Sequence, residues 1–435
     1  MKDDPEKHSL SRRNFMKMTA GSVFTTFLVR SSSLAKSEAA TQNSLFSVNE
    51  IPANPFYSPH SPNNHAGIDC LIFLMANNGL SFYRSATTRA SSGPLGMIAA
   101  NDIVLLKVNA QWKYRGATNS DLVRGLIQAI QNHPDGFNGE IVIFENGQGR
   151  GSLNCDTYEA YGNSDVHANA LDESHSFVYL ADNIFKGSRI SAFLLDPIRN
   201  TFINRDDHGT NGYRILENIS YPCFTTKWGT RVELKEGIWN GSSYSQNIKL
   251  INIPVLKTHG GSEITASLKH YYGIVSMSDG QVGFRHYTGL GETTGKMVVS
   301  VRPPVLNIMD AIWVSHRALQ GYPADKTFNA NRIAASQDPV ALDYWAAKYI
   351  LYPIEKNYSH HPDNATIQDW LHVAQGFINA RGGLYNPQAG IFVNEVTKTE
   401  SEMVVTSDSA ARFIQNGPGT ILRKFKDRER PRRRF

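Results

Sequence analysis

Short, almost wholly apolar runs alternate with amphipathic segments along most of this chain, a pattern typical of an α/β fold. The apolar runs predict buried strands of the kind that parallel sheets place between two layers of helices. The segment Ser120–Gln131 predicts a helix with one apolar face, and Thr118-Asn119-Ser120 offers candidates for its N-cap. The predicted strands are Cys70–Met75, Ile103–Leu106, Glu140–Phe144, Ile248–Leu256, Val305–Ile312 and Arg332–Ala335, and the other predicted helices are Ile264–Val275 and Pro339–Leu351.

The fold class that this pattern predicts is α/β, with a mainly parallel sheet, flanking helices, an inserted loop-rich β segment and a helical C-terminal extension. The insertion is expected at about residues 195–247, which are rich in Asn, Gly, Asp, Thr and aromatic residues. The expected organisation is a signal peptide (1–35), a linker rich in Ser, Pro, Asn and His (36–68), an α/β domain (69–351) and a C-terminal extension with a basic tail (352–435).

Charge is concentrated at the two ends of the chain. The 435 residues carry a formal charge of +5, but residues 1–35 hold six Lys or Arg against three acids, and Arg423–Arg434 holds eight basic residues against two acids. Because these ends contribute +3 and +6, residues 36–422 carry −4. The basic balance therefore does not indicate a nucleic-acid partner.

The N-terminus is typical of an export signal. Ser11-Arg12-Arg13-Asn14-Phe15-Met16-Lys17 is a twin-arginine motif, followed by a weakly apolar run, Met18–Val29, and a small-residue site at Ser33-Leu34-Ala35. The alternative, a membrane anchor, would need roughly 20 apolar residues. We therefore expect the twin-arginine export machinery as a partner, a periplasmic location, and no membrane span after signal cleavage.

Cofactors and metals stay open at this point. Signals of this kind export folded proteins, often because a cofactor is inserted before export, but the signal does not name one. Cys70, Cys155 and Cys223 are far apart and show no CxxC spacing, so the chain has no iron–sulfur cysteine motif. Two interpretations of the cysteines remain: one disulfide, or three small buried residues.

Lysines at the ends of two predicted strands point to a binding site. Lys107 and Asn109 follow one strand, while Lys257, His259, Gly260 and Gly261 follow another. In an open parallel sheet, ligands bind beyond the carboxyl ends of strands, where glycines allow close backbone approach and helix N-termini favour anions. The alternative interpretation is a solvent-exposed lysine followed by an ordinary turn.

Several acidic residues near other predicted strand ends are further candidates. Asp310 lies in "NIMDA", Asp338 follows "RIAASQ", and Asp343 lies on the helix after it. Asp338 precedes Pro339, so a helix N-cap is the competing interpretation for this residue. Asp343 could equally face solvent.

The segments "NDIVLLKVN", "INIPVLKTHGGSEITASLKHYYGIV", "NIMDA" and "AASQDPVALDYWAAKYI" resemble the domain-of-unknown-function family 362, in patches over roughly residues 69–351. The resemblance implies one α/β domain in proteins that are often exported or paired with iron–sulfur modules, without an agreed reaction. This chain departs from the family in having Leu268-Lys269-His270 where Leu-Lys-Asn is common, and in lacking ferredoxin-type cysteines. The resemblance implies these recurrent positions: Lys107, Asn109, Lys257, His259, Lys269, Gly273, Asp310, Asp338 and Asp343.

Two functions from different classes fit these residues. In the first, the protein is an exported enzyme: Lys107, Lys257 and Lys269 hold an anionic carboxylate or phosphate, and His259 is the general acid/base, with its pKa lowered by the lysines. Asn109, Gly260, Gly261, Asp310, Asp338 and Asp343 would complete the ligand site. In the second, the same residues bind or deliver an anionic ligand without turnover. An electron-transfer role is disfavoured by the missing cysteine motifs. Because Lys269 and His270 are adjacent on a predicted helix, only one of them is expected to face the site.

Overall fold

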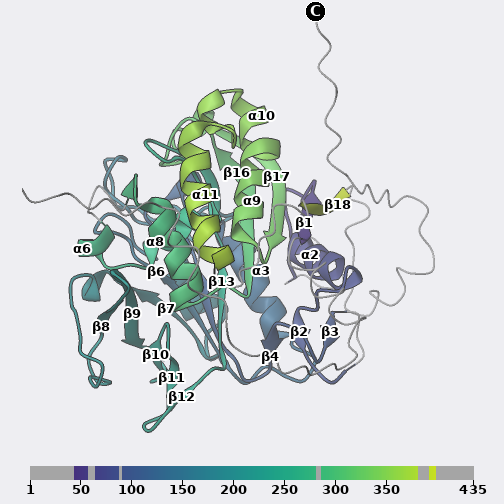
Figure 1. Cartoon of the computed structure of the whole chain (residues 1–435). Helices are drawn as coiled ribbons and strands as arrows, with labels where there is room; N and C mark the ends of the chain where they lie inside the picture. The colour runs from purple at the N-terminus through teal and green to yellow at the C-terminus, as the bar shows by residue number, and fades with distance from the viewer. Residues whose placement is uncertain (1–43, 57–63, 88–90, 281–285, 381–390, 398–435) are drawn as a thin grey trace, which may run out of the picture.

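The computed structural model describes residues 44–56, 64–87, 91–280, 286–380 and 391–397. In these residues a large, mainly parallel sheet lies between helices, and a smaller antiparallel sheet lies beside it (Figure 1). The predicted α/β class, the mainly parallel sheet and the helical C-terminal region are confirmed. The strands of the large sheet, in spatial order, are β18 (Phe392–Thr397), β1 (Ser44–Asn49), β17 (Thr327–Ser336), β16 (Leu306–Ser315), β13 (Ile248–Asn252), β5 (Ile103–Lys107), β6 (Glu140–Glu145) and β7 (Ile190–Leu194).

Parallel pairing dominates the centre of this sheet. From β16 through β13, β5 and β6 to β7 every neighbouring pair is parallel, whereas β17 is antiparallel to both β16 and β1. Two short strands extend it on one side, because β14 (Val255–His259) pairs with β16 and β15 (Glu263–Thr265) pairs with β14. The carboxyl ends of the parallel neighbours β5 and β6 therefore lie at the same end of the sheet, where Lys107 and Glu145 are the last strand residues.

Each face of the central strands packs into a separate apolar core. Val104 and Leu106 of β5 face one core, while Leu105 between them faces the other, as the alternation of side chains along a strand requires. In Figure 1, α8 (Leu290–Lys296), α9 (Pro339–Ala346) and α11 (Ala365–Ala380) lie in front of the central strands. The first core includes α2 (Ala66–Asn77), α3 (Ser120–Gln131) and α4 (Phe177–Tyr179), and the second includes α5 (Ser267–His270), α8 (Leu290–Lys296), α9 (Pro339–Ala346) and α11 (Ala365–Ala380).

Two helix starts follow the predicted capping chemistry. Asn119 Oδ1 accepts the N–H of Leu122 at 2.9 Å, and α3 has the predicted bounds. At α9, Asp338 Oδ1 accepts the N–H groups of Val340 and Ala341 at 2.8 and 2.9 Å, and Pro339 is the first helical residue. The predicted helix continues beyond α9 as a π-helical segment, Ala347–Leu351.

The prediction of a strand at Cys70–Met75 was wrong, because these residues belong to α2. The helix is capped by His65, whose Nδ1 accepts the N–H of Ile68 at 3.3 Å. Most of its residues are buried, so no polar face marks the helical period. An apolar run of this kind does not distinguish a buried helix from a buried strand.

The prediction of a helix over Ile264–Val275 was largely wrong. The segment begins in β15, forms the single helical turn α5, and continues as a 3₁₀ turn, Tyr271–Gly273. The predicted strand Ile248–Leu256 is likewise two strands, β13 and β14, separated at Pro254, which lacks the N–H that a continuous ladder needs. Lys257 therefore lies inside β14 and not beyond a strand end.

The other elements include a strand in the predicted linker and a second, smaller β sheet. Strand β1 lies within residues 36–68, which the composition predicted to be linker. The predicted β insertion forms the five-stranded sheet at the lower left of Figure 1. None of the described helices combines the length and hydrophobicity that crossing a bilayer requires. The strands of the five-stranded sheet are β8 (Gly212–Leu216), β9 (Ile219–Thr225), β10 (Arg231–Glu233), β11 (Gly237–Trp239) and β12 (Tyr244–Ser245). A small sheet contains β2 (Tyr83–Arg84), β3 (Ser92–Gly93) and β4 (Ile98–Ala99). The short helices are α6 (Met277–Gly280) and α10 (Tyr352–Glu355).

Candidate functional site: a lysine-lined cavity

A cavity of about 590 Å³ opens at the carboxyl ends of β5 and β6, beside β14 and α5. The structure brings six of the predicted site residues to its wall, although they lie far apart in the sequence. Glu145 also lines it, together with amide, hydroxyl and aromatic side chains. The predicted residues at the cavity are Lys107, Asn109, Lys257, His259, Gly260 and Lys269.

Lys107 is held by three acceptors, which is the full capacity of an ammonium group. Its Nζ donates to the carboxylate of Glu145, to the Val108 carbonyl at 2.9 Å and to His270 Nε2 at 3.1 Å. Burial raises the pKa of Glu145 to about 7, and the charge and hydrogen bond of Lys107 limit that rise. Lys107 and Glu145 therefore form a buried ion pair that neutralises the floor of the cavity.

Gly273 makes room for this ion pair. A Cβ atom at this position would lie 2.4 Å from Glu145 Oε1 and 2.8 Å from Lys107 Nζ. Distances below 3.0 Å are closer than side-chain carbons approach other atoms, so a larger residue here would displace the pair. This packing gives a physical reason for a glycine at a position that the family resemblance marks as recurrent.

The tautomer of His270 follows from a chain of amides behind the ion pair. Asn252 Nδ2 donates to Asn307 Oδ1 at 2.9 Å and to the Ser267 carbonyl at 3.0 Å, so Asn252 Oδ1 faces His270. His270 Nδ1 donates to that oxygen at 2.7 Å, which leaves Nε2 to accept from Lys107. His270 and Lys269 both line the cavity, so the expectation that only one of them would face it was wrong.

Lys257 is a fully buried lysine with partial hydrogen bonding. Its Nζ donates to Asn109 Oδ1 at 3.3 Å and to the Gly116 carbonyl. Asn109 is fixed in turn, because its N–H donates to Thr118 Oγ1 at 2.8 Å. Burial lowers the pKa of Lys257 to about 7, while the nearby carboxylate of Glu145 opposes that change. Lys257 therefore presents a cation, with one N–H remaining for a ligand.

Lys269 differs from Lys257 in lacking a hydrogen-bond partner. The residue is 6% exposed, and its buried Nζ donates to no acceptor among the described residues. Its Nζ lies 5.6 Å from the centroid of the Tyr272 ring. Burial, with a smaller contribution from the charge of Lys257, lowers the pKa of Lys269 to about 7. A buried lysine with an unmet donor at a cavity wall lacks the anion or acceptor that would satisfy it.

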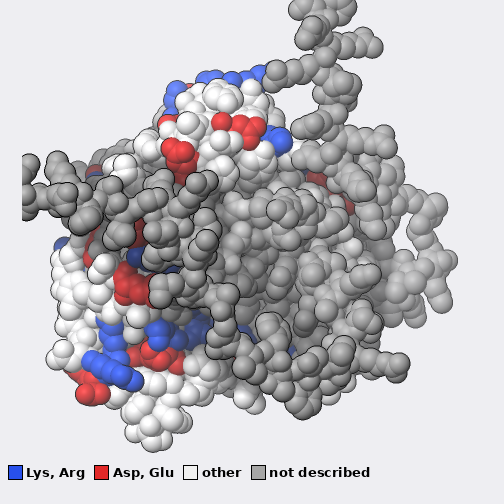
Figure 2. All heavy atoms as spheres, viewed as in Figure 1, with Lys and Arg blue, Asp and Glu red and all other residues white. Residues whose placement is uncertain are grey.

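The charge of the cavity wall is unbalanced. Its cations are Lys107, Lys257, Lys269 and the half-exposed Arg150, and Glu145 is the one carboxylate among the described lining residues. Since Glu145 is already paired with Lys107, its charge offsets the field of Lys257 only in part. Figure 2 shows acidic and basic side chains intermixed on the described part of one outer face, in contrast to this interior.

His259 belongs to an aromatic side of the cavity. Its ring lies 5.3 Å from that of His286, which lies 4.8 Å from Tyr272. His259 Nδ1 donates to the Gly260 carbonyl, so Nε2 carries no proton in the neutral ring. Burial, then the charges of Lys269 and His286, lower the pKa of His259 to about 2. The predicted direction of this change is confirmed, but a histidine so rarely protonated is a poor general acid at neutral pH.

The three candidate aspartates lie away from the cavity wall and hold backbone groups. Asp310 accepts the N–H of Asn119 at 2.7 Å, Asp338 caps α9, and Asp343 accepts the N–H groups at the start of α5, Ser267 at 2.6 Å and Leu268 at 2.9 Å. Burial raises the pKa of each to about 7, and these N–H donors oppose the rise. Gly261 is also absent from the lining; it has a φ of +81° and packs against Tyr287.

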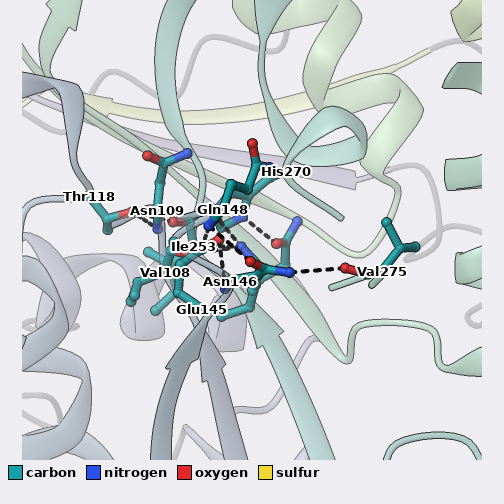
Figure 3. Close-up of polar contacts among 12 residues, drawn as sticks. Val108, Asn109, Thr118, Glu145, Asn146, Gln148, Ile253, His270 and Val275 are labelled. Atoms are coloured by element: carbon teal, nitrogen blue, oxygen red, sulfur yellow. Dashed lines mark hydrogen bonds and ion pairs between the residues drawn. The ribbon is translucent and has the colours of Figure 1, made fainter. Parts of the chain in front are cut away.

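Several cavity residues carry no sequence signal that would have placed them there. Thr265, His286 and Gln111 line the cavity, but no motif or spacing marks them. Glu145-Asn146 does stand at a strand end in the sequence; Asn146 Nδ2 donates to the Val275 carbonyl at 3.1 Å and so ties β6 to the segment after α5 (Figure 3). Polar residues at the ends of predicted strands were therefore the sequence feature that could have identified further cavity residues.

Residues 232–348 match the sequence model of a family described as Domain of unknown function (DUF362). The match spans β14, α5 and α9, and confirms the family resemblance over those residues. No curated protein and no solved structure matches the chain. Within the described residues no group of three or more His, Cys, Asp or Glu side chains is placed to hold a metal ion. The three cysteines are buried and form no disulfide, so the disulfide interpretation was wrong.

Proposed function

We propose that this protein binds a small organic anion, a carboxylate or a phosphate, in the lysine-lined cavity. The observation that carries the proposal is the buried Nζ of Lys269, which lines the cavity and has no hydrogen-bond acceptor among the described residues. Lys257 adds a second cation with one N–H left to donate. An anion between the two lysines would supply the missing acceptor, and its charge would raise the pKa of the lysine that holds it.

Calorimetric titration of the purified protein with oxalate and with inorganic phosphate at pH 6.5 tests this proposal. We expect saturable binding of at least one anion. Lys269→Met, which keeps most of the length of the side chain, should weaken it about 10- to 100-fold, because a hydrogen bond to a charged group contributes roughly 1.5–3 kcal/mol. The control is Lys227→Met, since Lys227 is exposed and paired with Asp182 away from the cavity. Binding by neither anion, or equal binding by the Lys269 variant, would contradict the proposal.

Turnover is the second candidate, favoured by the burial of two lysines at the cavity, which lowers the pKa of each to about 7. Groups that change charge near neutrality suit proton transfer. We therefore propose that acid/base chemistry, if the ligand is a substrate, passes through these lysines, with His259 positioned as a neutral contact. His259→Gln would then retain most turnover, whereas a loss of turnover with unchanged affinity would assign the role to His259.

We also propose that the protein is exported by the twin-arginine route and works in the periplasm. The support is the motif around Arg12-Arg13, which lies outside the described residues. Replacing Arg12 and Arg13 together by Lys should leave the protein in the cytoplasmic fraction of a host with this export machinery. Equal export of the variant and the unaltered chain would remove the support.

A further inference from the structure

The structure assigns different roles to the two unusual lysines: we propose that Lys269 forms an imine with the carbonyl group of a 2-oxo acid whose carboxylate Lys257 holds. This inference rests on the proposed anion site and goes further, by naming the substrate class and the reacting atom. It follows from the hydrogen-bond partners of the two amines and from the positions of Lys257 and Thr265 across one strand pair.

Hydrogen bonding separates the two lysines. Lys257 donates to two oxygen acceptors, Asn109 Oδ1 and the Gly116 carbonyl, and such acceptors stabilise the ammonium form. Lys269 has none among the described residues, so only the cation–π contact with Tyr272 offsets the loss of hydration of its ammonium form. The charge of Lys257 further disfavours a second cation beside it. The neutral amine of Lys269, with its lone pair, is therefore the accessible nucleophile, and Lys257 is the cation.

The hydroxyl of Thr265 supplies a third polar contact at the same place. Lys257 and Thr265 are directly opposite each other in the β14–β15 pair, and both line the cavity. Residues paired in this way have Cβ atoms about 4.5–5.5 Å apart. Thr265 Oγ1 is buried and has no hydrogen-bond partner among the described residues. It can therefore donate to the oxygen of a carbonyl group next to a carboxylate bound at Lys257.

The covalent step balances without an oxidant or reductant. The lone pair of Lys269 Nζ forms a bond to the carbonyl carbon, the π electrons move to oxygen, and one N–H proton passes to that oxygen to give a carbinolamine. The hydroxyl then leaves with a second proton as water, which gives the imine. The protonated imine would be a cation in the place of the ammonium group, 5.6 Å from the Tyr272 ring, where a cation–π interaction favours it.

Reductive trapping tests this inference. The purified protein is incubated with pyruvate and sodium cyanoborohydride at pH 7.5, and intact mass and peptide mapping locate the adduct. We expect one saturable adduct per chain, on Lys269, at a rate at least tenfold above that of any exposed lysine. Lys269→Met should abolish this adduct, Lys257→Met should reduce its yield at low pyruvate concentration, and Lys227→Met should leave it unchanged.

Two results would overturn the inference: no adduct on Lys269, or labelling spread over exposed lysines at equal rates. Oxalate binding distinguishes failure of the imine from failure of the anion site, because oxalate has carboxylates but no ketone. If oxalate binds in the cavity and pyruvate leaves no adduct, the imine is refuted and the anion site stands. If oxalate does not bind and no adduct forms, both proposals fail. Folding of each variant is checked by its thermal unfolding midpoint, and Lys269→Arg, which retains a cation without a nucleophilic amine, replaces the Met variant if that one is unfolded.

Discussion

Replacing Lys107 by Met tests whether the buried ion pair with Glu145 holds the floor of the cavity together. The substitution removes the donor to the Val108 carbonyl and to His270 Nε2. Leaving these two acceptors without a donor should cost roughly 2 kcal/mol at any pH, at the low end of about 1–3 kcal/mol for each buried unsatisfied group. This part of the loss does not depend on the ionisation of Glu145.

A second part of the loss depends on pH. With Lys107 present the pKa of Glu145 is raised by burial to about 7, and the lysine charge is what limits the rise. Without that charge the pKa moves higher, so above pH 7 the variant keeps Glu145 protonated where the unaltered protein has it ionised. In the unfolded chain Glu145 is ionised throughout this range. Relative to the unaltered protein, the free energy of unfolding of the variant therefore falls by about 1.36 kcal/mol for each pH unit above 7, or roughly 2 kcal/mol at pH 8.5.

The expected destabilisation is therefore about 2 kcal/mol at pH 6 and about 4 kcal/mol at pH 8.5, the latter within the range for a broken buried ion pair. Urea unfolding at both pH values, followed by tryptophan fluorescence, measures the difference. Adding Glu145→Gln to the variant should remove the pH dependence. A loss that is equal at pH 6 and pH 8.5 would refute the assignment to Glu145.

Two further predictions concern the same cavity. Gly273→Ala places a methyl group 2.4 Å from Glu145 Oε1 and should reduce the free energy of unfolding by about 1–3 kcal/mol. The control is Gly376→Ala, where nothing lies within 4 Å of the added carbon and no reduction is expected. Equal urea midpoints for the two variants would contradict the packing argument. Oxalate affinity should fall as pH rises above about 7, because Lys257 and Lys269, whose pKa values are lowered to about 7, lose the charge that attracts the anion; calorimetry at pH 6.5 and 8.5 measures this, and a constant affinity would contradict it.

The sequence predicted the parts of this site that depend on local pattern and strand ends. Lys107 follows an apolar strand, and its position at the sheet edge follows from that pattern alone. The pairing of Lys107 with Glu145 depends on β5 and β6 being neighbours, which the local sequence does not determine. The helix–strand error at Cys70–Met75 has a similar origin, because burial on all sides removes the polar positions from which a period is recognised.

The acidic candidates show why strand ends alone are insufficient. Asp310 and Asp343 are fully buried, and their carboxylates accept backbone N–H groups from segments that are distant in sequence. Those segments meet only in the folded chain, so no spacing in the sequence distinguishes such a structural aspartate from a ligand-binding one. Lys269 presented the opposite difficulty: its unmet hydrogen-bonding capacity is visible only when its surroundings are known.

The pairing of β1 with β18 has a consequence for the timing of folding. These parallel neighbours come from the two ends of the described chain, and Asn49 Nδ2 donates to Glu395 Oε1 at 2.7 Å across 346 residues. Contacts between such distant residues require closure of a very long loop and slow the search for the native state. This edge of the sheet can form only after the ribosome has released residues through Thr397, so the pairing of β1 with β18 must wait until more than 340 further residues have been synthesised.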